Sequence, residues 1–349
     1  MASSKKKWFG YLFTAALSLI LILALLVSAD VNEVSEELSH SSLSLIIVAA
    51  ILYLSMVFVR TVRWYILLKG AGQTLPFKSC IPHYAVGQAL NDVTPGRVLG
   101  DAVRAAGISE EEEGVSIGAS LSTLVYERVM DMLFTTIALV ASFASVYIFG
   151  IYKGAWDALT ILIILIVFGN LLVVGIISHP AIAAKVGAFG KWVSKALKNE
   201  KDRERFSTWV DKTVASFNEG RSLSWKKNRK HILNSVFLTI LIWCMEFTRM
   251  VIIFDAIGAT GFLSVIVLSS IISFTAQLIF PAGGGNMMVV SEFFQAAGLT
   301  SAVSATAGLL SIITSIWLMV PIALFIFILK KGRYGTRKGR ARQQHVANE

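Results

Sequence analysis

The sequence predicts an all-α polytopic membrane protein with about six transmembrane helices, two broken re-entrant hairpins and an inverted 3+3 repeat. The first observation behind this prediction is composition: 55% of the 349 residues are hydrophobic, 15% are charged, and the mean hydropathy is +0.68. The second is a series of apolar runs of about 20 residues, the length that spans a bilayer. The third is a pair of polar, glycine-rich stretches, 91–107 and 280–298, that stand between those runs.

The net charge of +10 does not indicate nucleic-acid binding in this chain. Lys and Arg gather in the segments that flank the apolar runs, as the positive-inside rule expects of cytoplasmic loops. The expected partners are therefore the membrane and an anionic lipid, with no nucleic acid. Cys80 and Cys244 lie in or beside apolar segments without CxxC or Cys/His spacing, which indicates free buried thiols. The sequence predicts no metal site and no cofactor.

The first repeat is expected within residues 1–150. It begins with the apolar run Trp8–Val27, which follows three lysines and is longer than the core of a signal peptide, so we expect an uncleaved span. The acidic loop 30–40 belongs outside the cell. The second span, Leu43–Leu68, returns to basic residues at the inner interface, where two aromatic side chains are expected in the interfacial belt: Arg60, Arg63 and Lys69, with Trp64 and Tyr65.

A re-entrant hairpin is expected over residues 79–107. Pro95 cannot donate a backbone hydrogen bond and Gly96 and Gly100 favour non-helical backbone, so the helix should break there. The apolar runs on either side of the break are too short to cross the bilayer. The third span, Val115–Phe149, then leads outward, with Ser109 expected as the N-cap of a glutamate-rich first turn.

The second repeat is expected within residues 151–349. Its spans are Trp156–Ile177, His231–Phe254 and Ala302–Leu329, and the basic loop 179–230 and the basic tail 330–349 are placed in the cytoplasm. Two apolar sets in the loop recur at helical spacing, which favours interfacial helices on an anionic leaflet over a small helical hairpin packed on itself. These sets are Ile182, Val186, Phe189, Val193 and Leu197, then Phe206, Trp209, Val210, Val214 and Phe217.

A second re-entrant hairpin is expected over residues 262–300. Residues 262–280 are long enough to span, but the segment after them is too short to cross back. Each half then holds two spans, a broken hairpin and a third span, in opposite orientation. Inverted repeats whose discontinuous helices meet near the midplane are typical of secondary transporters.

Several motifs in this order resemble the flippase-like transmembrane domain of the lysylphosphatidylglycerol synthases, which also occurs as a stand-alone protein. The motifs are Pro95-Gly96-Arg97, then Gly100-Asp101 with Arg104, then Tyr126-Glu127-Arg128 with Asp131, together with Arg63-Trp64 and the stretch from Pro281 to Glu292. The resemblance covers essentially the whole chain. The last motif departs from the family pattern, because Asn286 to Ser291 separate its glycines from Glu292.

The resemblance implies movement of a lipid or a lipid-linked headgroup between leaflets. No soluble aminoacyl-transferase or glycosyltransferase domain follows in this sequence, so the synthase chemistry is not carried over. We therefore expect a translocator of an anionic phospholipid or a polyprenyl-phosphate-linked lipid, multi-pass in the cell membrane, with both termini cytoplasmic. The alternatives are a membrane enzyme, or a subunit that recruits a soluble synthase or glycosyltransferase through the basic loop.

Charged residues inside the spans are the candidate binding residues. Glu127, Arg128 and Asp131 lie well inside the third span, with Arg128 expected beside Asp131; they line a cavity or clasp the first hairpin. Arg97 and Arg104 suit a phosphate headgroup because a guanidinium offers it paired donors, unless Asp101 neutralises Arg104.

The remaining candidates depend on packing. Glu246 and Arg249, three residues apart in the fifth span, are expected to form a clasp. Gly283, Gly284 and Gly285 offer backbone amides to an anion or allow close helix packing. Arg63, Asn286 and Glu292 complete the predicted substrate-binding set. No catalytic residue is predicted, because an Asp-rich metal motif, a nucleotide-binding glycine loop and a nucleophile–base pair are all missing from the sequence, which favours a transporter over an enzyme.

Overall fold

The computed structural model describes residues 19–112, 114–178, 225–259 and 262–329, with single residues and short runs between 185 and 215. This described part contains helices and no strand, which confirms the all-α polytopic class. Five helices are long and apolar enough to cross a membrane: α3 (Leu43–Gly70), α6 (Ile117–Ile148), α7 (Trp156–Ser178), α10 (Trp225–Ala256), and α13 (Ser301–Ile312), which continues through the π-helical turn η2 (Ile313–Trp317) to Leu329. Most of the predicted first span lies outside the described residues.

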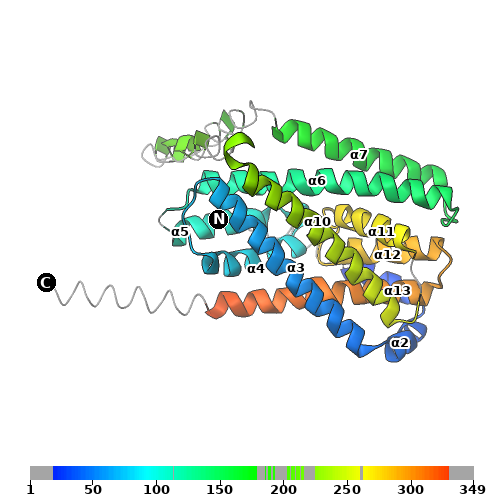
Figure 1. Ribbon diagram of the computed structural model, residues 1–349. Helices are drawn as coiled ribbons and strands as arrows, with labels where there is room; N and C mark the ends of the chain where they lie inside the picture. Colours follow the sequence, from blue (N-terminus) through cyan, green and yellow to red (C-terminus); the bar gives the residue numbers. More distant parts are fainter. Residues whose placement is uncertain are drawn as a thin grey trace.

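Figure 1 shows α6, α7 and α13 in roughly the same direction, with α3 and α10 packed together and crossing them obliquely. One end of this bundle carries Lys69, Lys78 and Lys230 and is called the basic end below. The other end carries α2 (Val31–His40), whose first turn contains Glu33, and is called the acidic end. Between the long helices, a pair of short helices fills each half of the bundle.

The first pair is α4 (Phe77–Val93) and α5 (Leu99–Glu111), joined by the short turn η1 (Pro95–Arg97) in the basic half. Gly96 and Arg97 both have positive φ, +74° and +53°, so the chain reverses there as the sequence predicts. The helices approach closely because a Cβ at Gly100 would overlap with the carbonyl oxygen of Gly87. This pair is the hairpin expected over residues 79–107.

The second pair is α11 (Leu263–Ala276) and α12 (Gly284–Ala296) in the acidic half. Its connection repeats the backbone of the first, since Ala282 and Gly283 have φ of +59° and +100°. Gly285 lies against the end of α11, where an added Cβ would stand 2.6 Å from the Ala276 carbonyl carbon. This pair is the hairpin expected over residues 262–300.

The two hairpin tips meet in the middle of the bundle and share backbone hydrogen bonds. The Gly96 amide donates to the Leu278 carbonyl at 2.9 Å, and the Ala282 amide donates to the Asp92 carbonyl at 2.7 Å. Each tip therefore satisfies a backbone donor of the other, which a broken helix inside a membrane requires. The two hairpins and the five described spans follow one another in the predicted order; the inverted repeat and the re-entry of the hairpins from opposite membrane faces stay predictions.

Two predicted boundaries were wrong. The acidic loop 30–40 is the helix α2, because Asp30 accepts a hydrogen bond from the Asn32 amide at 2.9 Å and caps it, and Val34 is buried. Ser109 is not an N-cap: it lies within α5 and donates to the Ala105 carbonyl at 2.8 Å. The following helix α6 is capped instead by Ser116, whose hydroxyl oxygen accepts from the Ala119 amide.

Three side chains lie elsewhere than the sequence predicts. Trp64 is fully buried, not in an interfacial belt, and its indole donates to Thr123 at 3.1 Å. Arg63 is 3% exposed, not interfacial, because carboxylates of α6 surround it. Cys80 is buried as expected, whereas Cys244 is exposed. In the loop 179–230, the described residues between 185 and 215 are helical, and most of the two predicted apolar sets lie outside the described residues.

Candidate functional site

A buried ion-pair network lies where the first hairpin meets α3 and α6. Arg104 of α5 forms an ion pair with Glu127 of α6, and both side chains are nearly inaccessible to solvent. Arg63 of α3 lies 3.4 Å from the same carboxylate and makes paired contacts of 2.7 and 3.0 Å with both oxygens of Asp131. Three elements are thus joined by charges that would be costly to bury alone.

The network continues through Asp101, which accepts from both Arg128 and Asn91 at 2.8 Å. Asp101 also lies 3.4 Å from Arg104, so it does neutralise that guanidinium in part. The sequence placed Arg128 beside Asp131, but the neighbouring helices supply other partners: Arg128 reaches the hairpin and Asp131 binds Arg63. Contacts between helices replace the expected pair within one helix.

The tip of the first hairpin carries Arg97, which is 5% exposed. Its guanidinium lies 3.1 Å from Asp92, donates to Gln277 of the second hairpin at 3.0 Å, and stacks 4.9 Å from the Phe274 ring centre. Asp92 in turn accepts from Gln88 at 2.9 Å. Arg97 therefore links the two tips by its side chain as well as by their shared backbone bonds.

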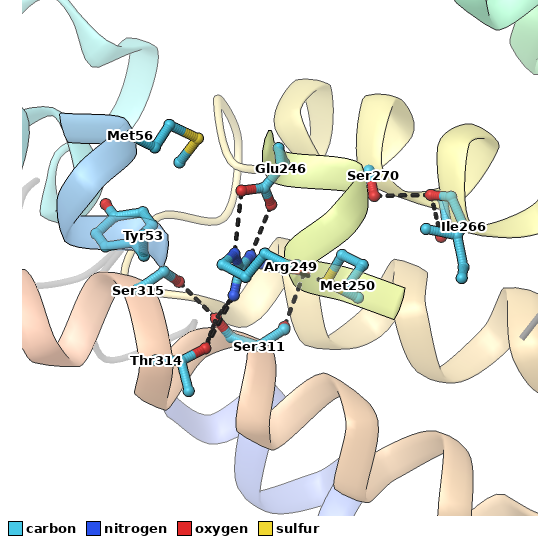
Figure 2. A network of polar contacts seen from close by, with 12 residues as sticks. Tyr53, Met56, Glu246, Arg249, Met250, Ile266, Ser270, Ser311, Thr314 and Ser315 are labelled. Atoms are coloured by element: carbon cyan, nitrogen blue, oxygen red, sulfur yellow. Dashed lines mark hydrogen bonds and ion pairs between the residues drawn. The ribbon is translucent and has the colours of Figure 1, made fainter. Parts of the chain in front are cut away.

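A second cluster surrounds Arg249 of α10 and is drawn in Figure 2. Its guanidinium contacts Glu246 at 2.6 and 3.1 Å, which confirms the clasp predicted from their spacing. On the other side it donates to the Ser311 carbonyl at 3.1 Å and the Thr314 hydroxyl at 2.9 Å, beside the π-helical turn of the last span. Such turns often mark functional positions in helices.

Two small adjacent cavities lie among these groups, of about 50 and 20 Å³. We call them together the chamber; their common wall is formed by Arg60, Gln88, Arg97, Trp243 and Phe274. The larger cavity extends toward Arg249 and the smaller toward Glu127. This space accommodates a few water molecules and is too small for a lipid headgroup.

The structure brings most of the predicted site residues to this chamber. Arg63, Arg97, Asp101, Arg104, Glu127, Arg128 and Asp131 line the smaller cavity, and Asn286 lines the larger one, where it accepts from the Ser311 hydroxyl at 3.3 Å. Glu292 lies elsewhere: it is exposed on α12, and its charge adds to partial burial in raising the pKa of the Tyr152 phenol.

Two of the three glycines of the second hairpin, Gly283 and Gly285, pack closely against neighbouring helices. A Cβ on Gly283 would lie 2.8 Å from the Ile312 side chain, and Gly285 contacts the end of α11. The amides of Gly284 and Gly285 donate to carbonyls of the same turn, at 3.4 and 3.1 Å, so they are not directed at the chamber. Of the two alternatives for these residues, the contacts favour close helix packing over anion binding.

Among the chamber residues that sequence reasoning did not assign to the site are Tyr53, Arg60, Asp92 and Gln277. Tyr53 donates to Asp92 at 3.4 Å, and Arg249 lies 5.7 Å from the centre of the Tyr53 ring. A signal was present, because Tyr53, Arg60 and Arg63 lie seven and three residues apart on one face of α3. Asp92 is the second-last residue of α4, directly before the helix break, and an acidic residue at that position needs a partner.

These features define a class: an integral membrane protein with a buried, charged chamber between two broken helical hairpins. Among the described residues no group of His, Cys, Asp and Glu is placed to hold a metal ion. The chain belongs to the family described as the lysylphosphatidylglycerol synthase TM region, whose sequence model matches residues 11–327. This match confirms the resemblance found in the motifs.

Archaeal relatives are similar over nearly their whole length. The chain is 23% identical over 330 residues to a UPF0104 membrane protein of Pyrococcus horikoshii, which covers 90% of this chain and 94% of the relative. It is also 23% identical over 342 residues to one of Methanocaldococcus jannaschii, covering 93% and 96%. No solved structure matches the chain.

Proposed function

We propose that the protein translocates an anionic lipid, a phospholipid or a polyprenyl-phosphate-linked lipid, between the leaflets of the cell membrane. The observation that carries this proposal is the meeting of two broken hairpins, one from each end of the bundle, around a chamber lined by buried arginines. Buried charges and broken backbone inside a membrane bundle are rare and mark transport paths in other proteins.

The headgroup is the part of the lipid that needs this path. Its phosphate would bind Arg97, whose Nε has no hydrogen-bond partner in the closed state. The apolar chains remain in the bilayer. Because the chamber holds only a few waters, one hairpin has to move away from the other before the headgroup enters, and opening toward alternate faces completes the transfer.

The basic end is proposed to face the cytoplasm, with both chain termini there. A soluble synthase or glycosyltransferase that makes the lipid would then meet the protein at this end. The alternative function, a membrane subunit that assists lipid modification, differs in one respect. It requires co-purification of the soluble enzyme and needs no transfer of lipid between leaflets.

Translocation is tested in liposomes that contain the purified protein and a trace of fluorescent phosphatidylglycerol. A membrane-impermeant reductant bleaches the outer-leaflet lipid alone unless translocation supplies the rest. We expect nearly complete bleaching with wild-type protein and with Lys69→Gln, which removes an exposed charge from the same bundle. The slow phase of bleaching reports lipid that reaches the outer leaflet by translocation. Arg97→Gln should slow this phase by about tenfold or more, because a hydrogen bond to a charged group contributes ~1.5–3 kcal/mol.

Two outcomes contradict the proposal. One is wild-type protein that moves none of a set of anionic phospholipids and polyprenyl phosphates. The other is an Arg97→Gln variant that melts at the wild-type temperature and moves lipid at the wild-type rate. Arg97→Lys keeps the charge and is expected to retain part of the activity.

A further inference from the structure

The chamber has one more positive than negative side chain. Its lining contains six arginines: Arg60, Arg63, Arg97, Arg104, Arg128 and Arg249. It contains five carboxylates: Asp92, Asp101, Glu127, Asp131 and Glu246. No lysine or histidine lines either cavity. With all of these groups ionised, the closed chamber carries a net charge of +1.

The unmatched charge belongs to Arg60. Each of the other five arginines has a carboxylate oxygen within 3.4 Å. Arg60 has none within ion-pair distance among the described residues; its Nη2 lies 3.9 Å from the Met56 sulfur, which is a weak acceptor. Its side chain is half-buried and lines both cavities, so its charge faces the chamber.

A second observation also indicates an anion at this place. Arg97 shares the wall between the two cavities with Arg60, and its Nε is buried without a hydrogen-bond partner. Five donors on each guanidinium lie in a fixed plane that matches two oxygens of a phosphate. An anion in the common wall would therefore neutralise Arg60 and bind the free donor of Arg97.

We propose that the chamber selects a lipid whose headgroup carries a single negative charge, a phosphodiester, and that Arg60 is the residue that sets this preference. The inference rests on the proposed function, because it names the lipid class that would pass. A dianionic phosphomonoester would leave one negative charge unmatched in the chamber, and a zwitterionic headgroup would leave Arg60 unmatched. Both are disfavoured in a low-dielectric site.

Lipid binding is measured by native mass spectrometry of the full-length protein released from detergent. The probes are phosphatidylglycerol with one negative charge, phosphatidylcholine with none net, and phosphatidic acid at an alkaline pH where its phosphate carries two. We expect wild-type protein to bind phosphatidylglycerol about tenfold more tightly than either of the others. Arg60→Gln should abolish this preference, Arg60→Lys should keep it, and Lys69→Gln, a charge removed from the same helix, should leave it unchanged.

The inference is overturned if Arg60→Gln keeps the wild-type preference, or if wild-type protein binds phosphatidic acid as tightly as phosphatidylglycerol. Its failure is distinct from that of the proposed function. If wild-type protein translocates lipid in liposomes but Arg60→Gln keeps the wild-type lipid preference, the charge selection alone is refuted. A monoanion preference that depends on Arg60, without translocation by wild-type protein, refutes the transport proposal alone.

Discussion

At the scale of single residues, the site is a set of buried charges in which every carboxylate contacts at least one arginine. Glu127 is 2% exposed, accepts a hydrogen bond from Arg104 and lies 3.4 Å from the Arg63 guanidinium. Removing one member of such a pair leaves an uncompensated buried charge, which is more costly than removing both. The same pairs therefore hold the structure together, and in the proposed function they keep the guanidinium groups where a phosphate would meet them.

We predict that Arg104→Met and Glu127→Met each lower the free energy of unfolding by ~3–5 kcal/mol. The double variant should lose clearly less than the sum, because it leaves fewer charges without a partner. Thermal unfolding in detergent measures all three, with Lys69→Met as the exposed control. Strictly additive losses would show that the two side chains do not act as a pair.

The sequence identifies most of these residues because charge is rare inside apolar spans, but it does not identify their partners. Arg128 was expected beside Asp131 in its own helix, yet it binds Asp101 from the hairpin. Spacing along one helix identifies the possible partners within that helix. The partner that a charged side chain binds also depends on which charges the adjacent helices supply. For the same reason Arg60 appeared to be an interfacial residue, although it lines both cavities.

At the scale of elements, the two hairpins share one construction. Each has two successive residues with positive φ at its tip, and in each tip one of the two is not glycine, Arg97 and Ala282. A non-glycine residue in this region costs ~1–2 kcal/mol and persists only where its surroundings impose it. The proline and glycines that break the helices were evident in the sequence. The helix α2 was not, because its acidic residues resembled a solvated loop.

The close packing of the first hairpin predicts a contrast between two glycines. Gly100→Ala places a Cβ against the Gly87 carbonyl and 2.5 Å from the Asn91 side-chain oxygen, so we expect a loss of ~1–3 kcal/mol from overpacking. Gly169→Ala in α7 has no atom within 4 Å of the new Cβ, and it should be neutral or stabilising by up to ~1 kcal/mol. Melting temperatures in detergent compare the two; equal effects would contradict the hairpin contact.

At the scale of the whole molecule, the hairpins extend from opposite ends of the bundle and close on each other. Helix-breaking residues and the lengths of the apolar runs were sufficient to predict their places in the order of elements. The contact between their tips was not predictable, because it depends on backbone groups about 180 residues apart, such as those of Gly96 and Leu278. That contact divides the bundle into two halves and closes the chamber between them.

The central claim is that these tips separate whenever a lipid crosses. Its most direct test is a disulfide between two introduced cysteines, Val93→Cys and Ala282→Cys, in a protein with Cys80→Ala and Cys244→Ser. Ala282 donates a backbone hydrogen bond to Asp92, and Val93 directly follows Asp92. Single-cysteine variants treated in the same way are the controls. We predict that oxidation joins the two cysteines, that translocation of phosphatidylglycerol in liposomes stops, and that reduction restores it. Lipid transfer at the full rate with the tips joined, or failure of a folded double-cysteine variant to cross-link, would contradict the account.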